Sequence, residues 1–252
     1  MHLCLYVFFI FQSVSSFGAV NSHGGTGRLK SNLLTKIEEL KGIGAKFAVD
    51  GRDRKVEESI SRLCAGLEAN IDADSLAFPS LSGKVEGCWR LLYSNNSPGT
   101  RTGESTNGLL RVSAVYQIIS FGCLGGSVAS GTDSADTNMN TGNSVANVLR
   151  VEGPWPLVPR DGLRISLMHS CAVQSQKVPA LLAIDLESVE VNSPGTELPS
   201  GTIPWSKIVR PFILRRGYFE TSYIDDDLRL SRGPLGEIRV FRREEEEEQL
   251  AS

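Results

Sequence analysis

Few side chains in this chain of 252 residues could carry out acid–base or nucleophilic chemistry. Of its three histidines, only His169 lies outside the N-terminal segment, and it falls in an alternating stretch, residues 163–173, that is typical of a β-strand. No serine lies in a G-x-S-x-G motif, and no cysteine and aspartate accompany His169 in a catalytic set. We therefore interpret His169 as a satisfied or exposed strand residue and predict no catalytic residue.

Metal and phosphate sites are equally weakly supported. Asp225, Asp226 and Asp227 offer hard oxygen ligands, but consecutive turn residues point in different directions and lack the D-x-D-x-D-G spacing of a calcium loop. Residues 99–103, G-T-R-T-G, lack the spacing of a phosphate loop and are expected to connect two strands. The five cysteines are odd in number without a CxxC pair, which predicts buried free thiols. No metal or cofactor is predicted.

The most informative segment is residues 217–233, which is typical of a β-hairpin. Residues 219–224 alternate as a half-buried strand does, with Phe219 and Tyr223 on one face. Residues 225–227 are acidic turn residues, and residues 228–232 resume a strand. The second strand carries two arginines at fixed positions, so the face of the strand on which each arginine lies can be predicted.

Those arginines, Arg229 and Arg232, are candidates to contact Trp89. Gly87-Cys88-Trp89 has the G-x-W arrangement of lipocalin barrels, in which an arginine from a late strand lies over the indole. Such a cation–π contact is worth about 0.5–2 kcal/mol and would close the barrel end. The alternative is that Arg229 or Arg232 points into the cavity and holds a ligand carboxylate or carbonyl oxygen. Strand alternation predicts that the two face opposite ways.

The elements that position these residues are mainly strands. Helical spacing predicts a short helix over residues 33–41 that stops at Gly42, and a second helix over residues 53–67 that Asp53 caps. A polar stretch, residues 122–142, interrupts a predicted hairpin over residues 115–151; its composition favours a mobile insertion, with a lid as the alternative. Other strands are predicted over residues 88–94, 109–121, 144–151, 163–173, 180–191 and 237–241, and a loop over residues 193–205.

The chain ends predict targeting and solvated segments. Residues 3–11 are an apolar run of signal-peptide length, so residues 1–16 are predicted to be a signal peptide, with an uncleaved anchor as the alternative. Residues 17–32 contain no acid and are similar to a transit peptide, which resembles the bipartite plastid leader of algae with extra plastid membranes. The folded domain is predicted over residues 33–243, and residues 244–252 are an acidic tail. The net charge of −3 argues against a nucleic-acid partner.

With these residues in view, the chain resembles the fibrillin family, also called plastid lipid-associated proteins. The resemblance rests on the helix over residues 56–67, on G-C-W-R-L-L-Y-S at residues 87–94, and on Y-I-D-D-D-L-R-L-S-R-G at residues 223–233, the most specific segment. It also includes residues 115–118 and 147–149. It implies a mainly β fold, a lipocalin-like antiparallel β-barrel with two N-terminal helices. It also implies a noncatalytic plastid protein of thylakoids or plastoglobules that binds or organises isoprenoid lipids such as carotenoids and prenylquinones.

The leading hypothesis is that the barrel interior receives an apolar isoprenoid chain and that Arg229 or Arg232 anchors its polar head. The expected lining residues are Trp89, Leu91, Tyr93, Tyr116 and Tyr223. One alternative is a structural coat, or a docking partner of a prenyl-chain enzyme of prenylquinone synthesis, in which side chains fill the barrel. A less favoured alternative is a lipid- or xanthophyll-modifying enzyme that uses His169 or the aspartates of residues 225–227.

Overall fold

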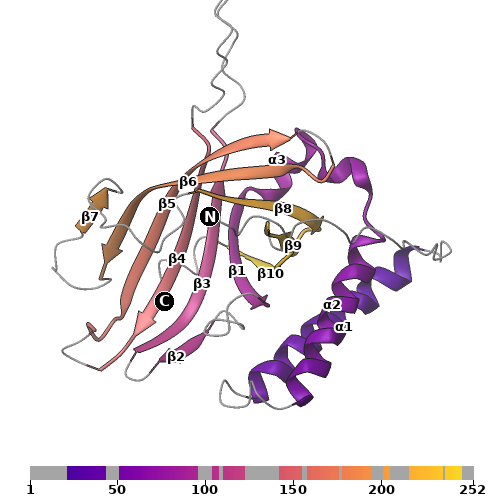
Figure 1. Ribbon diagram of the computed structural model, residues 1–252, viewed down its shortest axis with the longest axis horizontal. Coiled ribbons are helices and arrows are strands. Elements are labelled where there is room, and N and C mark those ends of the chain that lie inside the picture. The colour runs from indigo at the N-terminus through magenta and orange to yellow at the C-terminus, as the bar shows by residue number, and fades with distance from the viewer. Residues whose placement is uncertain are drawn as a thin grey trace, which may run out of the picture.

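The computed structural model describes residues 22–43, 51–95, 104–107, 110–122, 142–154, 158–175, 178–193, 201–204, 216–234 and 236–245. Its centre is a closed antiparallel ring of eight strands, which confirms the predicted lipocalin-like barrel (Figure 1). Around the ring the strands are β1 (Gly87–Ser94), β10 (Ile238–Glu244), β9 (Leu228–Arg232), β8 (Arg216–Ile224), β6 (Leu181–Asn192), β5 (Leu163–Ser175), β4 (Ser144–Glu152) and β3 (Leu110–Ser120), which pairs again with β1.

The ring closes over only part of the length of its longest strands. Residues 87–90 of β1 pair with residues 116–119 of β3, and residues 181–185 of β6 pair with β8. Beyond these pairings, β3 continues beside β2 (Ser105–Asn107) and β6 continues beside β7 (Gly201–Pro204). Figure 1 shows the long strands β3 to β6 extending past the short strands β8 to β10. We call this extension the open half; it comprises residues 110–115, 148–152, 163–167 and 187–192.

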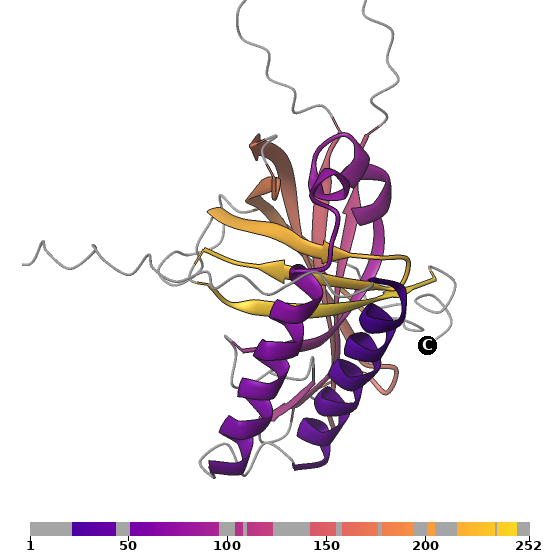
Figure 2. The same cartoon turned by 90° about the vertical axis from the view of Figure 1, so that its right-hand side faces the viewer.

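Two antiparallel helices, α1 (Ser22–Ile43) and α2 (Gly51–Glu68), lie side by side against the outer face of the β8, β9, β10 and β1 side (Figure 2). The predicted stripe on α2 is buried as expected, and α1 contributes Leu33, Ile37 and Leu40 to the same cluster. α1 begins at Ser22, earlier than predicted, and so it overlaps residues 17–32; Leu29 extends its apolar stripe by one turn. α2 begins at Gly51, so Asp53 lies inside the helix and is not its cap.

Two short elements that the sequence did not reveal cover one end of the barrel. These are the 3-10 helix η2 (Ala73–Leu76) and the helix α3 (Ser80–Val85). Leu76, Leu81 and Val85 pack into the cluster that fills the barrel interior at this end. The indole Nε1 of Trp89 donates a 2.8 Å hydrogen bond to the carbonyl oxygen of Val85. We call this end the covered end.

The predicted strands agree with the observed ones to within three residues wherever the structure describes them. Two observed strands were not predicted: β2, to which no element was assigned, and β7, which lies in the stretch predicted as a loop. Glu244 belongs to β10 rather than to the tail. The β3–β4 hairpin is confirmed, and at its neck the amide of Gly122 donates to the carbonyl of Gly142 at 3.1 Å. A side chain at Gly122 would place its Cβ 2.8 Å from the Cα of Gly142, so this approach requires glycine. Residues 123–141 of the predicted insertion lie outside the described residues.

None of the helices that the structure describes is both long enough and apolar enough to cross a bilayer.

Candidate functional site

Two β-bulges decide which side chains of the barrel point inward. In β1, Leu91 lies opposite Phe241 and Tyr93 lies opposite Val240, so Leu92 is an extra residue. An extra residue reverses the alternation of a strand. Leu91 therefore joins the interior cluster, whereas Tyr93 joins the cluster beneath α1 and α2.

The second bulge has the same effect in β8. Thr221 lies opposite Ser231 and Tyr223 lies opposite Leu230, which leaves Ser222 as the extra residue. Tyr223 consequently packs beneath the helices, and its hydroxyl donates to Asp225 Oδ2 at 2.8 Å. The expectation that Tyr93 and Tyr223 line the interior is wrong, because the predicted alternation ignored both bulges.

Tyr116 also lies outside, for a different reason. It pairs with Arg90, whereas the next residue, Gln117, pairs with Trp89. Opposite residues in a ladder share a face, so Gln117 points inward with Trp89 and Tyr116 points outward. The guanidinium of Arg150 lies 5.5 Å from the centre of the Tyr116 ring. The predicted interior position of Tyr116 is therefore wrong as well.

Trp89 is buried in the interior at the covered end, between two arginines. The Cζ atom of Arg229 lies 5.1 Å from the centre of its ring system, which confirms a predicted contact. The Cζ atom of Arg243, a residue that we did not predict, lies only 4.2 Å away. The only signal for Arg243 was its place in the last strand, and the acidic run beside it suggested a solvated tail.

Arg243 is the arginine that closes the barrel. Its Nε donates to the carbonyl oxygen of Asp226 at 2.8 Å and its Nη1 to that of Glu86 at 2.9 Å, while Nη2 donates to the carbonyl of Lys84. These bonds join β10 to the end of α3 and to the β8–β9 turn. Gly87, with φ of 115°, leaves the space that this guanidinium occupies, because a Cβ there would lie 2.9 Å from Nη1. Arg243 therefore supplies closing contacts in addition to the contact of Arg229 with Trp89.

Arg229 is fully buried, with none of its surface exposed. Its Cζ lies 4.5 Å from the ring centre of Phe241 and 5.9 Å from that of Phe219, and its Nη2 donates to Gln117 Oε1. Within the described part of the chain, its Nε and Nη1 atoms have no hydrogen-bond partner and no carboxylate forms an ion pair with it. Burial, followed by the charges of Arg239 and Arg243, lowers the pKa of Arg229 to about 9.

A polar pair and an apolar wall lead from Arg229 toward the open half. Gln117 Nε2 donates to Asn147 Oδ1 at 3.1 Å, and Asn147 pairs with Leu167 in the next strand. The inward-facing apolar side chains of the open half are only partly buried by the described residues, in contrast to those at the covered end. By register with Gln117 and Asn147 they are Val115, Leu149, Ile165, Leu167, Val189 and Val191.

Arg232 faces the opposite way from Arg229, as predicted, and fastens α2 to the barrel. Its Nε and Nη2 donate to the two carboxylate oxygens of Glu68 at 2.8 and 2.7 Å, and the Ser222 hydroxyl donates to the same carboxylate at 2.6 Å. This hydrogen bonding raises the pKa of Arg232. Arg232 thus has a strong partner within the chain.

The other residues singled out from the sequence make contacts that are typical of structural residues. His169 is half-buried with Nδ1 3.2 Å from the carbonyl oxygen of Val145, and burial lowers its pKa. Asp225 accepts hydrogen bonds from the amides of Asp227 and Leu228, which confirms the predicted turn. Burial raises the pKa of Cys64 to about 12, as expected for an inert thiol. Among the described residues, no three His, Cys, Asp or Glu side chains are arranged to hold a metal.

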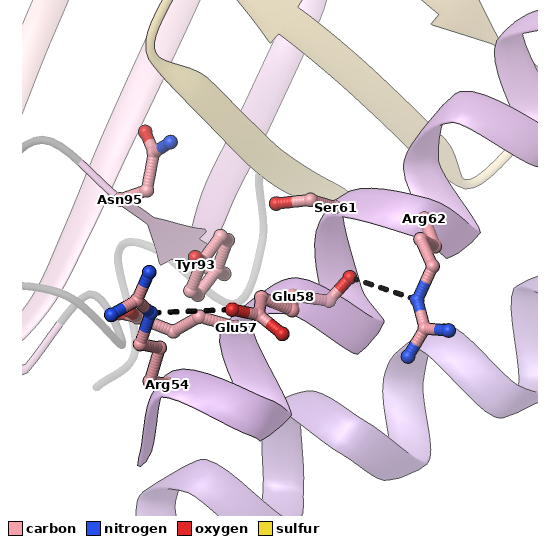
Figure 3. A pocket seen from close by; sticks show the side chains of 7 residues that line it. All are labelled: Arg54, Glu57, Glu58, Ser61, Arg62, Tyr93 and Asn95. Carbon is pink, nitrogen blue, oxygen red and sulfur yellow. Dashed lines mark hydrogen bonds and ion pairs between the residues drawn. The ribbon is translucent and has the colours of Figure 1, made fainter. Parts of the chain in front are cut away.

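A pocket of about 650 Å³ lies outside the barrel, between α2 and the end of β1 (Figure 3). Tyr93 reaches it from β1, but most of its lining is polar or charged. Arg54 Nε contacts Glu58 Oε1 at 3.2 Å, and Arg62 Nε donates to the carbonyl of Glu58 at 3.4 Å. This pocket is a solvated groove and does not suit an apolar ligand. Residues 99–103 lie outside the described residues.

Comparison with known proteins gives one family and one clear relative. The family model PAP_fibrillin matches residues 27–242. A protein of Arabidopsis thaliana named plastid-lipid-associated protein 6, chloroplastic, is 28% identical over 174 residues, which cover 63% of this chain and 52% of the relative. The chain therefore spans about half the length of that relative. No solved structure matches the chain.

Proposed function

Because this chain belongs to the PAP_fibrillin family, whose members are plastid lipid-associated proteins, we propose that it binds an apolar isoprenoid lipid inside its barrel and catalyses no reaction on it. Carotenoids and prenylquinones are the lipid classes that we propose, at the surface of thylakoids or plastoglobules. The chain would reach the plastid through the bipartite leader. Lys30 Nζ lies 3.0 Å from Asp225 Oδ2, so we place the processing site before Lys30, which keeps this ion pair in the mature protein.

The observation that carries the proposal is the position of Arg229. Its buried donors lie at the covered end, and a partly buried apolar wall leads from Gln117 and Asn147 to the open half. A chain that loses about 300 Å² of apolar surface to this wall gains about 7 kcal/mol. That gain offsets much of the free-energy cost of association without any chemical step. We place the polar head at Arg229 and the chain along the open half.

The test is mass spectrometry of the lipids that co-purify with the protein from its native organelle. We expect one isoprenoid lipid to be enriched over bulk membrane lipid, and Arg229→Met to remove the enrichment while the protein stays folded. Arg232→Met is the matched control, because Arg232 lies on the outer face and is expected to retain the lipid. No enrichment in the unchanged protein would contradict lipid binding inside the barrel.

That negative result would favour the second candidate, a coat or docking partner of a prenylquinone-synthesis enzyme. One observation favours this reading: large side chains, including Trp89, Phe219 and Phe241, fill the barrel at the covered end. In this case the exposed faces of α1 and α2 would carry the interaction. A pull-down from plastid extract would then recover a prenyl-chain enzyme equally well with Arg229→Met, since Arg229 is not at the surface.

A further inference from the structure

We infer that the preferred ligand of the barrel is acidic: an apolar chain that ends in a carboxylate or phosphate, whose negative charge neutralises Arg229. This inference rests on the proposed binding of an apolar chain inside the barrel and replaces the neutral head groups proposed above by an acidic one. Neutral carotenoids and prenylquinones would bind the same wall more weakly.

Arg229 differs from three other arginines of β9 and β10 in the partners that it contacts. Arg232 is paired with Glu68 at 2.7 Å, and Arg239 is paired with Glu237 at 2.8 Å. Arg243 is satisfied by three carbonyl oxygens. Arg229 is the most deeply buried of these four, yet its hydrogen-bond partner among the described residues is a neutral amide.

Hydrogen bonds and ring faces alone do not compensate a buried charge. A cation removed from water is normally paired with an anion, because an isolated buried charge is strongly unfavourable. The ring faces of Trp89, Phe219 and Phe241 offset part of this cost. What the described interior does not supply is a negative charge, and a ligand that enters from the open half can supply it.

The donors of Arg229 also indicate the kind of head group. Nε and Nη1 carry three N–H bonds without an acceptor in the described residues, and the buried Thr221 Oγ1 on the adjacent strand also has no partner there. A carboxylate or phosphate presents several oxygens and a charge, so it satisfies donors and neutralises the cation together. A quinone carbonyl satisfies donors but leaves the charge. A carotene satisfies neither.

The apolar side chains of the open half favour an acidic lipid over a small free anion. The apolar side chains of the open half, such as Leu149, Ile165 and Val191, offer nothing to inorganic phosphate. They are suited to a chain attached to the head. We therefore expect an acidic lipid to bind and inorganic phosphate not to compete with it at millimolar concentration.

The experiment compares all-trans-retinoic acid with its methyl ester, which has the same isoprenoid chain but a neutral head group that is larger by one methyl group. Both are isoprenoid chains, and both quench tryptophan fluorescence when they bind near Trp89. Each is titrated into the full chain after lipid removal, and into its Arg229→Met and Arg232→Met variants. We expect the acid to bind at least about tenfold more tightly than the ester in the unchanged protein, as one strong charge-assisted contact allows. The preference should disappear in Arg229→Met and persist in Arg232→Met.

The outcomes separate this inference from the proposed function. Equal affinity for acid and ester would overturn the acidic preference and leave lipid binding standing. No binding of either ligand would overturn both. Retention of the preference in Arg229→Met, or displacement of the acid by inorganic phosphate alone, would also overturn the inference.

A second measurement needs no variant and so does not depend on the folding of Arg229→Met. The carboxyl carbon of retinoic acid is labelled with ¹³C, and its chemical shift in the complex is followed as pH is lowered. Beside an uncompensated guanidinium the carboxylate stays ionised to a lower pH than in detergent micelles. A carboxyl pKa that is unchanged or raised on binding would overturn the inference.

Discussion

Replacing Arg229 by methionine should make the lipid-free protein more stable. Methionine is similar in length, flexible and apolar, so it can fill the space among Trp89, Phe219 and Phe241 without a charge. Most substitutions of fully buried residues destabilise a protein. An increase in stability would therefore be diagnostic of a charge that the fold does not need.

The size of the effect follows from the surroundings of Arg229. Burial lowers the pKa of Arg229 to about 9, well below the usual value of an arginine, and each unit corresponds to about 1.4 kcal/mol, so the buried charge costs on the order of 5 kcal/mol at neutral pH. Three aromatic contacts return about 2–3 kcal/mol, and loss of the donor to Gln117 Oε1 costs the variant about 1 kcal/mol. The balance favours Arg229→Met by about 1–2 kcal/mol, or about 2–8 °C in Tm for a domain of this size.

The assay is urea unfolding of the delipidated full chain at pH 7, with thermal unfolding beside it. The difference in the free energy of unfolding between Arg229→Met and the unchanged protein should narrow above pH 9. The unfolded chain keeps the Arg229 proton to a higher pH than the folded chain, which begins to lose it near pH 9, so the stability of the unchanged protein rises with pH above 9. Destabilisation of Arg229→Met by more than about 2 kcal/mol, with an unchanged m value, would refute the reasoning.

Three other predictions concern Arg243, Asp225 and Tyr116. Arg243→Met should destabilise the protein by about 2–4 kcal/mol in urea, because three backbone carbonyls lose their donor and Trp89 loses a cation–π contact; a neutral result would contradict its role in closure. Burial alone would raise the pKa of Asp225, but hydrogen bonds from Lys30 and Tyr223 lower it overall. The stability from this carboxylate is therefore complete above about pH 4 and is lost as pH falls through its folded pKa, so amide exchange in α1 should accelerate there and not in Asp225→Asn, which lacks the carboxylate. Tyr116→Phe should leave the affinity for retinoic acid within about twofold, because Tyr116 faces outward; a tenfold loss would place it in the site.

The sequence was sufficient to predict the eight strands of the ring but not which of their residues face the interior. Alternation identified the hairpin that carries Arg229, and the G-x-W motif identified its contact with Trp89. Leu92 and Ser222, the extra residues of the two bulges, have no glycine or proline beside them to signal an irregular strand. Because one extra residue exchanges the faces of a strand, Tyr93 and Tyr223 were assigned to the interior when they support the helices.

The covered end was missed for a related reason. α3 has only six residues, contains Gly83 and follows Pro79, so it is too short for helical periodicity to appear in the sequence. Arg243 sits where β10 runs into an acidic stretch, and its role depends on carbonyl groups of α3 and of the β8–β9 turn that only the fold brings together. Residues whose partners are backbone groups of distant elements leave no pattern that a single sequence can reveal.

The two arginines beside Trp89 have different roles: Arg243 stabilises the fold, whereas Arg229 binds the ligand. Arg243 is partly buried, lies against the indole and is satisfied by three carbonyl oxygens, so its contacts account for a structural role. Arg229 adds a buried charge whose cost is only partly offset in the lipid-free protein by its aromatic contacts and its hydrogen bond to Gln117. This free-energy cost makes the site selective for anions. An acidic ligand neutralises the buried charge and removes the cost, whereas a neutral ligand leaves the charge unpaired. Ligand binding then raises stability by RT ln(1 + [L]/Kd), so retinoic acid at one hundred times its Kd should stabilise the protein by about 2.7 kcal/mol. A tenfold weaker Kd in Arg229→Met should remove about half of this gain at the same concentration. Stabilisation of both proteins by the same amount would place the ligand away from Arg229.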